Sequence, residues 1–97
     1  MRMELKDTAE LMMSEDYKKR FVAEYAQTKI RYEKLKDYAN RIEAAYIAGG
    51  LGLTNVEHPK HDCPLDTLRN QQRIMGELLG IMELRAIIEH IDLSEVN

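Results

Sequence analysis

Apolar residues in the last third of the chain fall on two sides of one predicted helix. The main apolar arc has helical spacing and consists of Leu68, Met75, Leu79, Met82 and Ala86, with Ile74, Leu78, Ile81 and Ile88 beside it. A second set lies on the far side of the same helix and consists of Gly76, Gly80, Leu84, Ile87 and Ile91. A single partner helix covers only one such face, so this pattern predicts a homo-oligomer.

The middle of the chain carries a longer helical pattern. Its mostly apolar and aromatic positions alternate four and three apart, at Phe21, Tyr25, Thr28, Tyr32, Leu35, Ala39, Ile42 and Tyr46. A 3.5-residue repeat is typical of coiled-coil-like packing against another helix. Ser14 is a suitable N-cap, and Gly49-Gly50 suits a left-handed helix end. The sequence therefore predicts a helix over about 15–48.

The remaining segments complete an all-α fold. A Gly- and Pro-containing loop over 49–63 precedes a helix over about 64–91, with Pro64 at its first position. Residues 4–13 predict a short helix with Leu5, Ala9 and Met12 on one side. We expect a single domain over residues 1–97, formed by a short N-terminal helix plus a long antiparallel helical hairpin, and oligomeric.

Charge and composition restrict the classes of partner. The net charge is −3, with a basic middle segment and an acidic C-terminal half. Binding to duplex nucleic acid calls for a basic excess over a whole face, so duplex nucleic acid is not an expected partner. Cys63 is the only cysteine, which excludes an intrachain disulfide, and no apolar stretch is long enough for a signal peptide or a membrane span. We expect a cytoplasmic protein with no membrane partner.

Short groups of residues in both halves of the chain follow an ordered pattern. In the N-terminal half they are Ser14-Glu15-Asp16-Tyr17, Arg20-Phe21, Ala23-Glu24-Tyr25, Gln27, Arg31-Tyr32 and Lys34-Leu35. In the C-terminal half they are Cys63-Pro64, Leu68, Gln71, Met75, Arg85-Ala86, Ile88-Glu89, Ile91 and Leu93. With these groups the chain resembles a family of short proteins of tailed gut phages, including crAss-like phages, whose activity is unassigned. The stretch from Tyr46 to His61 departs from that pattern. The resemblance implies a phage accessory protein that acts in the cytoplasm of an infected bacterium.

The order of elements is also similar to that of phage sponges, which sequester the cyclic nucleotide signals of bacterial immune systems. Those proteins are small, multimeric helical hairpins with a short N-terminal segment. Gly80-Ile81-Met82 followed by Arg85-Ala86-Ile87 looks like a pattern in their final helix, with the register off by one residue. This likeness of architecture assigns no site.

A polar stripe on the middle helix is the first candidate ligand site. It contains Arg31, Lys34, Tyr38 and Arg41, preceded by Gln27 and Arg20. Arg and Lys donate hydrogen bonds to phosphate oxygens, and a Tyr ring, here Tyr38 or Tyr17, offers a stacking surface for a base. The alternative is a solvated face with ion pairs to Glu24 and Asp37.

The last helix adds two further features. Arg85 lies within the main apolar arc, either as an anion ligand repeated around a symmetry axis or as an Arg at the core edge held by Glu89. Gly76 and Gly80 each cost about 1 kcal/mol of helix stability relative to Ala, which indicates close approach by a neighbouring helix or by a ligand.

Catalytic and metal chemistry have little support in the sequence. His58, His61 and Cys63 are three potential zinc ligands. A structural zinc site has four protein ligands, so we expect no metal. Catalytic carboxylate pairs, a phosphate-binding Gly loop and a dinucleotide fingerprint are not found, so we expect neither an enzyme nor a cofactor.

These observations favour a counter-defence protein that binds and sequesters a small phosphate-bearing host signal of the cyclic nucleotide type, without cleaving it. The expected ligand-binding residues are Arg31, Lys34, Tyr38, Arg41, Arg85 and Tyr17. The alternative is an interaction protein, such as an anti-CRISPR-type inhibitor, that docks a helix face on a host defence protein. A purely structural phage accessory is the third possibility.

Overall fold

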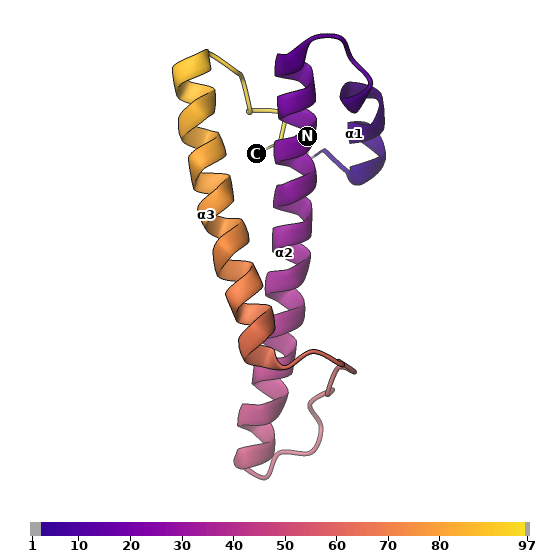
Figure 1. Ribbon diagram of the computed structural model, residues 1–97. Coiled ribbons are helices and arrows are strands. Elements are labelled where there is room, and N and C mark those ends of the chain that lie inside the picture. The colour runs from indigo at the N-terminus through magenta and orange to yellow at the C-terminus, as the bar shows by residue number, and fades with distance from the viewer. Residues whose placement is uncertain (1–2, 97) are drawn as a thin grey trace.

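A computed structural model describes residues 3–96, which form a helical hairpin with a short helix packed beside it (Figure 1). The helices are α1 (Leu5–Met12), α2 (Tyr17–Gly50) and α3 (Leu65–Glu89), and the described residues contain no strand. α1 and α3 lie on opposite sides of α2 in Figure 1. The prediction of an all-α hairpin with an N-terminal helix is confirmed, and each helix begins and ends within two residues of its expected bounds.

The two ends of α2 use different residues from those expected. Asp16 is the N-cap, and its carboxylate accepts a hydrogen bond from the amide of Lys18 at 2.9 Å, whereas Ser14 lies outside the helix. Gly49 and Gly50 remain helical, and the left-handed residue is Gly52, with φ of 77°. The predicted end at Gly49-Gly50 is wrong because these glycines can also adopt helical φ, and the chain reverses only after Leu51.

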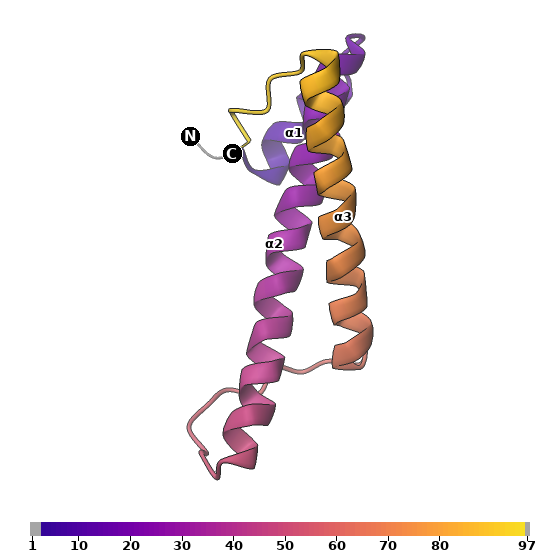
Figure 2. The same ribbon diagram turned by 90° about the vertical axis from the view of Figure 1, so that its left-hand side faces the viewer.

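The interface between α2 and α3 is built from the two predicted apolar patterns. The buried side chains of α2 include Phe21, Tyr25, Ala39 and Ile42, and those of α3 are Leu68, Leu79, Met82 and Ala86. Tyr46 is an exception, because it is 54% exposed although it continues the repeat. The last turns of α2 extend beyond the start of α3, so no helix covers them there (Figure 2).

α1 packs on α2 through a polar residue instead of its apolar face. Thr8 is 1% exposed, whereas Leu5, Ala9 and Met12 are exposed. The Thr8 hydroxyl donates to the carbonyl of Leu5 at 2.6 Å and accepts from the side-chain amide of Gln27 at 2.9 Å. Gln27, which the sequence placed in the polar stripe, therefore holds α1 against α2.

The segment after α3 closes the open end of the hairpin. α3 ends at Glu89, because His90 adopts left-handed backbone angles (φ 57°). The amide of Ile91 then donates a hydrogen bond to the carbonyl of Ala86 at 2.8 Å. Ile91 and Val96 then join the core cluster around Phe21 and Tyr25. Ile91 thus lies in the core of the chain itself, outside the helix on which it was predicted.

The two glycines of α3 have different surroundings. A Cβ placed on Gly76 would lie 3.2 Å from Cε1 of Tyr32, so the glycine admits the Tyr32 ring from α2. A Cβ on Gly80 would have no neighbour within 4 Å. Close approach by a neighbouring helix is thus confirmed for Gly76. Gly80 is exposed, and no other part of the chain lies against it.

No helix in the described part of the chain is long and apolar enough to cross a membrane.

Candidate functional site

The polar stripe of α2 is partly occupied by contacts within the chain. Arg41 pairs with Asp37 (Nε to Oδ2, 2.8 Å), and this ion pair raises the pKa of the Arg41 guanidinium. The Tyr38 hydroxyl donates to the carbonyl of Lys60, which fastens the loop to α2. Arg31 and Lys34 make no hydrogen bond or ion pair within residues 3–96, and both are exposed. These two cations are therefore available to an anionic ligand.

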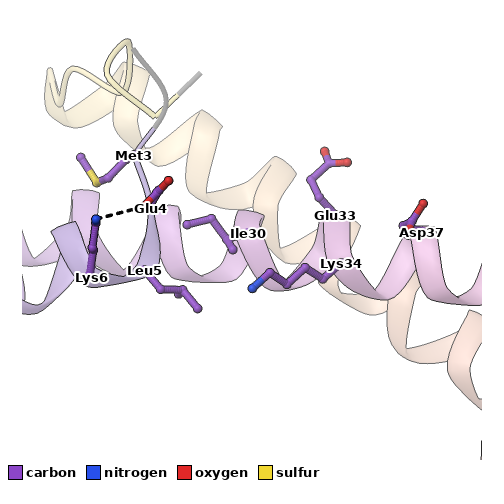
Figure 3. A pocket seen from close by; sticks show the side chains of 8 residues that line it. All are labelled: Met3, Glu4, Leu5, Lys6, Ile30, Glu33, Lys34 and Asp37. Atoms are coloured by element: carbon purple, nitrogen blue, oxygen red, sulfur yellow. Dashed lines mark ion pairs between the residues drawn. The ribbon is translucent and has the colours of Figure 1, made fainter.

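Lys34 also lines an open hollow between α1 and α2 (Figure 3). The hollow has a volume of about 640 Å³ and is lined by Met3, Glu4, Leu5, Lys6, Ile30, Glu33, Lys34 and Asp37. Three of these side chains are acidic and two are basic, and Lys6 is paired with Glu4 at 3.6 Å. Such mixed walls do not concentrate positive charge. No sequence pattern predicted this hollow, since α1 and α2 meet only in the tertiary structure.

Arg85 and Tyr17 come together at the open end of the hairpin. The Arg85 guanidinium lies over the Phe21 ring, 4.8 Å from its centroid, and its Nε donates to Glu89 at 2.9 Å. The Tyr17 hydroxyl donates to the other carboxylate oxygen of Glu89 at 3.0 Å. Of the two interpretations of Arg85, the structure favours an Arg at the core edge held by Glu89.

The six predicted ligand residues form two groups in one chain. Tyr17 and Arg85 share Glu89, whereas Arg31, Lys34, Tyr38 and Arg41 follow α2 away from that end. Tyr17 and Arg41 are separated by about 36 Å along the helix at 1.5 Å per residue. One small ligand cannot touch both groups of the same chain.

The hydrogen bonds around Glu89 lower its pKa. The Arg85 bond is the largest cause and the Tyr17 bond the second, because both donors favour the ionised carboxylate. The same contact raises the pKa of the Tyr17 hydroxyl, mainly through its hydrogen bond to Glu89.

We expect an NMR titration to place the pKa of Glu89 below about 4.3, the ordinary value for a glutamate, and to move it back up in Arg85→Ala. A depressed carboxyl pKa contributes stability above the unfolded-state value, and this contribution is lost as the pH falls through the folded-state value. Acid unfolding should therefore depend less on pH in Glu89→Gln. Glu95→Gln is the control for the loss of one negative charge, because this carboxylate has no hydrogen bond or ion pair in the described residues.

Two of the three potential zinc ligands, His58 and His61, form aromatic contacts with each other and with Tyr46. His58 lies edge-on to Tyr46, with ring centroids 5.1 Å apart, and to His61 at 6.1 Å. Nδ1 of His61 is 2.6 Å from the carbonyl oxygen of Cys63, which requires a proton on that nitrogen. Within residues 3–96, no group of three His, Cys, Asp or Glu side chains could hold a metal ion.

Comparison with known families gives one match. A family model described as Sequestin matches residues 15–88 of the chain. The chain belongs to the Sequestin family. The family name is that of a protein that sequesters something, and it specifies no ligand. No curated protein and no solved structure matches the chain.

The Sequestin match covers the hairpin and leaves out the rest. It contains α2, the loop and all of α3 except Glu89, whereas α1 and the C-terminal segment lie outside it. All six predicted ligand residues fall inside the matched range. The hairpin is therefore the part of this chain through which a function shared by the Sequestin family would act.

Proposed function

We propose that this protein is a non-enzymatic phage counter-defence protein that binds a small phosphate-bearing immune signal of the cyclic nucleotide type. It would act as a sponge in the cytoplasm of the infected bacterium. Membership of the Sequestin family supports sequestration as the activity. The observation that supports this ligand class is the pair of exposed cations Arg31 and Lys34, which make no hydrogen bond or ion pair within residues 3–96, in a chain whose net charge is −3.

The chemistry of binding follows from the side chains present. The Arg31 guanidinium donates to two phosphate oxygens at once, and Lys34 adds a point charge within one helical turn. A nucleobase requires an aromatic surface, which Tyr38 or Tyr17 provides. Binding of this kind stabilises the intact signal and breaks no bond, so the ligand would be released unchanged on denaturation.

An interaction protein is the second candidate, and the exposed apolar face of α3 favours it. Ile81, Leu84 and Ile87 are each more than half exposed, which is unusual for side chains of this size. In this alternative, a helix of a host defence protein covers the face, and the stripe on α2 has no ligand.

A panel of cyclic oligonucleotides and cyclic ADP-ribose-type signals should raise the melting temperature of the protein, because a ligand that binds only the folded state stabilises it by RT ln(1 + [L]/Kd). Arg31→Ala and Lys34→Ala should each weaken binding by about tenfold to a hundredfold, since a hydrogen bond to a charged group contributes about 1.5–3 kcal/mol. Calorimetry measures the affinities, and mass spectrometry of the recovered ligand checks that it is intact.

Lys36→Ala is the matched control for Lys34→Ala. The two lysines are both exposed, and two residues of helix place them on nearly opposite sides of α2. Lys36→Ala should leave the affinity unchanged. A flat response of the wild-type protein to the whole panel, together with stoichiometric binding of a host defence protein, would favour the interaction protein instead.

A further inference from the structure

The face of α3 that points away from α2 is apolar and uncovered. Its large aliphatic side chains are 45–74% exposed and consist of Ile74, Leu78, Ile81, Leu84, Ile87 and Ile88. The buried residues Leu79, Met82 and Ala86 lie on the other side of the same helix, against α2. An uncovered aliphatic face of this extent marks an interaction surface.

The residues of this face are arranged symmetrically around Ile81. Ile74 and Ile88 are equidistant from Ile81 along the helix, and so are Leu78 and Leu84. Five of the six side chains therefore follow this symmetry, whereas the counterpart of Ile87 is Met75, which is not part of the exposed face.

Charged residues on the same side of α3, among these aliphatic side chains and at their edge, follow the same symmetry with opposite signs. Arg73 and Glu89 are equidistant from Ile81, and Glu77 and Arg85 are closer to it and also equidistant. Within the chain, the ion pairs are Arg73 with Glu77 and Arg85 with Glu89, both at 2.9 Å and both on the surface. The order of these four charges is thus unchanged if the helix is reversed and the signs are exchanged, whereas Glu83, which accepts a hydrogen bond from Tyr25 of α2, has Leu79 as its counterpart.

We propose that this face binds the same face of a second copy of the chain, with the two α3 helices antiparallel and a two-fold axis beside Ile81. In that arrangement, each residue lies at the same height along the helix axis as its counterpart in the partner, that is, level with it. Ile74 is level with the partner's Ile88, and Ile81 with the partner's Ile81. Glu77 is level with the partner's Arg85, so the charges at equal height attract.

The charges select this arrangement over the alternatives. In a parallel pair, each charge would lie level with its own copy, and Arg85 would be level with the partner's Arg85. A two-fold interface uses the same surface patch on both subunits, which must therefore be self-complementary. A foreign helix imposes no such requirement, so the symmetry of this face indicates a second copy of the chain.

Disulfide trapping tests the arrangement of the helices. In a Cys63→Ser background, Ile81→Cys should be oxidised rapidly to a covalent dimer, because a disulfide needs Cα atoms within about 7 Å. Ile74→Cys should remain monomeric on denaturing gels, since the two copies of residue 74 would be about 21 Å apart along the helices. Ile74→Cys combined with Ile88→Cys should again cross-link. Self-cross-linking of Ile74→Cys alone, or no cross-linking of any variant, would overturn the proposal.

Charge reversal gives an independent test by sedimentation equilibrium. Arg85→Glu should weaken dimerisation by about tenfold, because it places like charges level at two positions of the dimer. Glu77→Arg combined with Arg85→Glu should restore the dimer, although each substitution disrupts an ion pair within its own chain. Ile47→Glu, at an exposed isoleucine of α2, should have no effect. A wild-type monomer, or a double variant weaker than Arg85→Glu, would contradict the antiparallel pairing.

Discussion

Tyr25→Ala should lower the free energy of unfolding by about 3–5 kcal/mol, the usual cost of truncating a fully buried aromatic side chain. Tyr25 is 0% exposed and lies in the core cluster at the open end of the hairpin, where α2, α3 and the C-terminal segment meet. A protein of this size has about 5–15 kcal/mol of stability in total, so the variant should lose a large share of it. Urea denaturation at fixed protein concentration measures the change.

Tyr25→Phe separates the ring from its hydroxyl group. The hydroxyl donates to the carboxylate of Glu83, which is exposed and can be solvated when the donor is removed. The substitution should therefore cost only about 0.5–1.5 kcal/mol. An equal cost for the two variants would show that the hydrogen bond, and not the packing of the ring, stabilises this end of the hairpin.

Ile42→Ala should destabilise the protein by about 2–5 kcal/mol, because Ile42 is 0% exposed and truncation leaves a cavity between α2 and α3. Ile47→Ala is the matched control. It makes the same change on the same helix, at a side chain that is 60% exposed. Chemical denaturation should show a change within about 0.5 kcal/mol for the control. Similar losses for both would mean that the far end of α2 is covered in solution.

Together, these two positions test whether the hairpin is stabilised along its length. Tyr25 lies in the core cluster that includes Ile91 and Val96 of the C-terminal segment, whereas Ile42 lies nearer the other end of α2, where the loop bonds to Tyr38 and α3 bonds to Asn40 through Arg69. Dimerisation through the outer face of α3 would add stability that depends on protein concentration, so the variants must be compared at equal concentration.

The electrostatic contacts explain why the ligand residues could be predicted only as a set of candidates. Spacing along α2 correctly placed Arg31, Lys34, Tyr38 and Arg41 on one side of the helix, and it anticipated that Asp37 forms an ion pair there. It could not show that Tyr38 is held by the carbonyl of Lys60, because that contact depends on the path of the loop. Spacing also could not show that Tyr17 and Arg85 meet at Glu89, because these two residues lie on different helices.

The sequence by itself determined the helices and the main core. Periodicity places Leu68, Leu79, Met82 and Ala86 on one face of α3 wherever that helix lies, and the structure buries all four against α2. The same periodicity showed that α3 has a second apolar face. These features follow from the 3.6-residue period of the helix, which is local.

Only the tertiary structure decided which side of each helix meets a neighbour within the chain. The apolar side of α1 is exposed because Thr8 can bond to Gln27, and Tyr46 is exposed because α3 begins too late to cover it. Gly76 contacts Tyr32, whereas Gly80 contacts nothing, although both glycines follow the same pattern in the sequence. Which side chains are buried depends on how far one helix extends past another and on contacts between residues far apart in the sequence. The helical period describes only neighbouring residues, so it cannot predict these contacts.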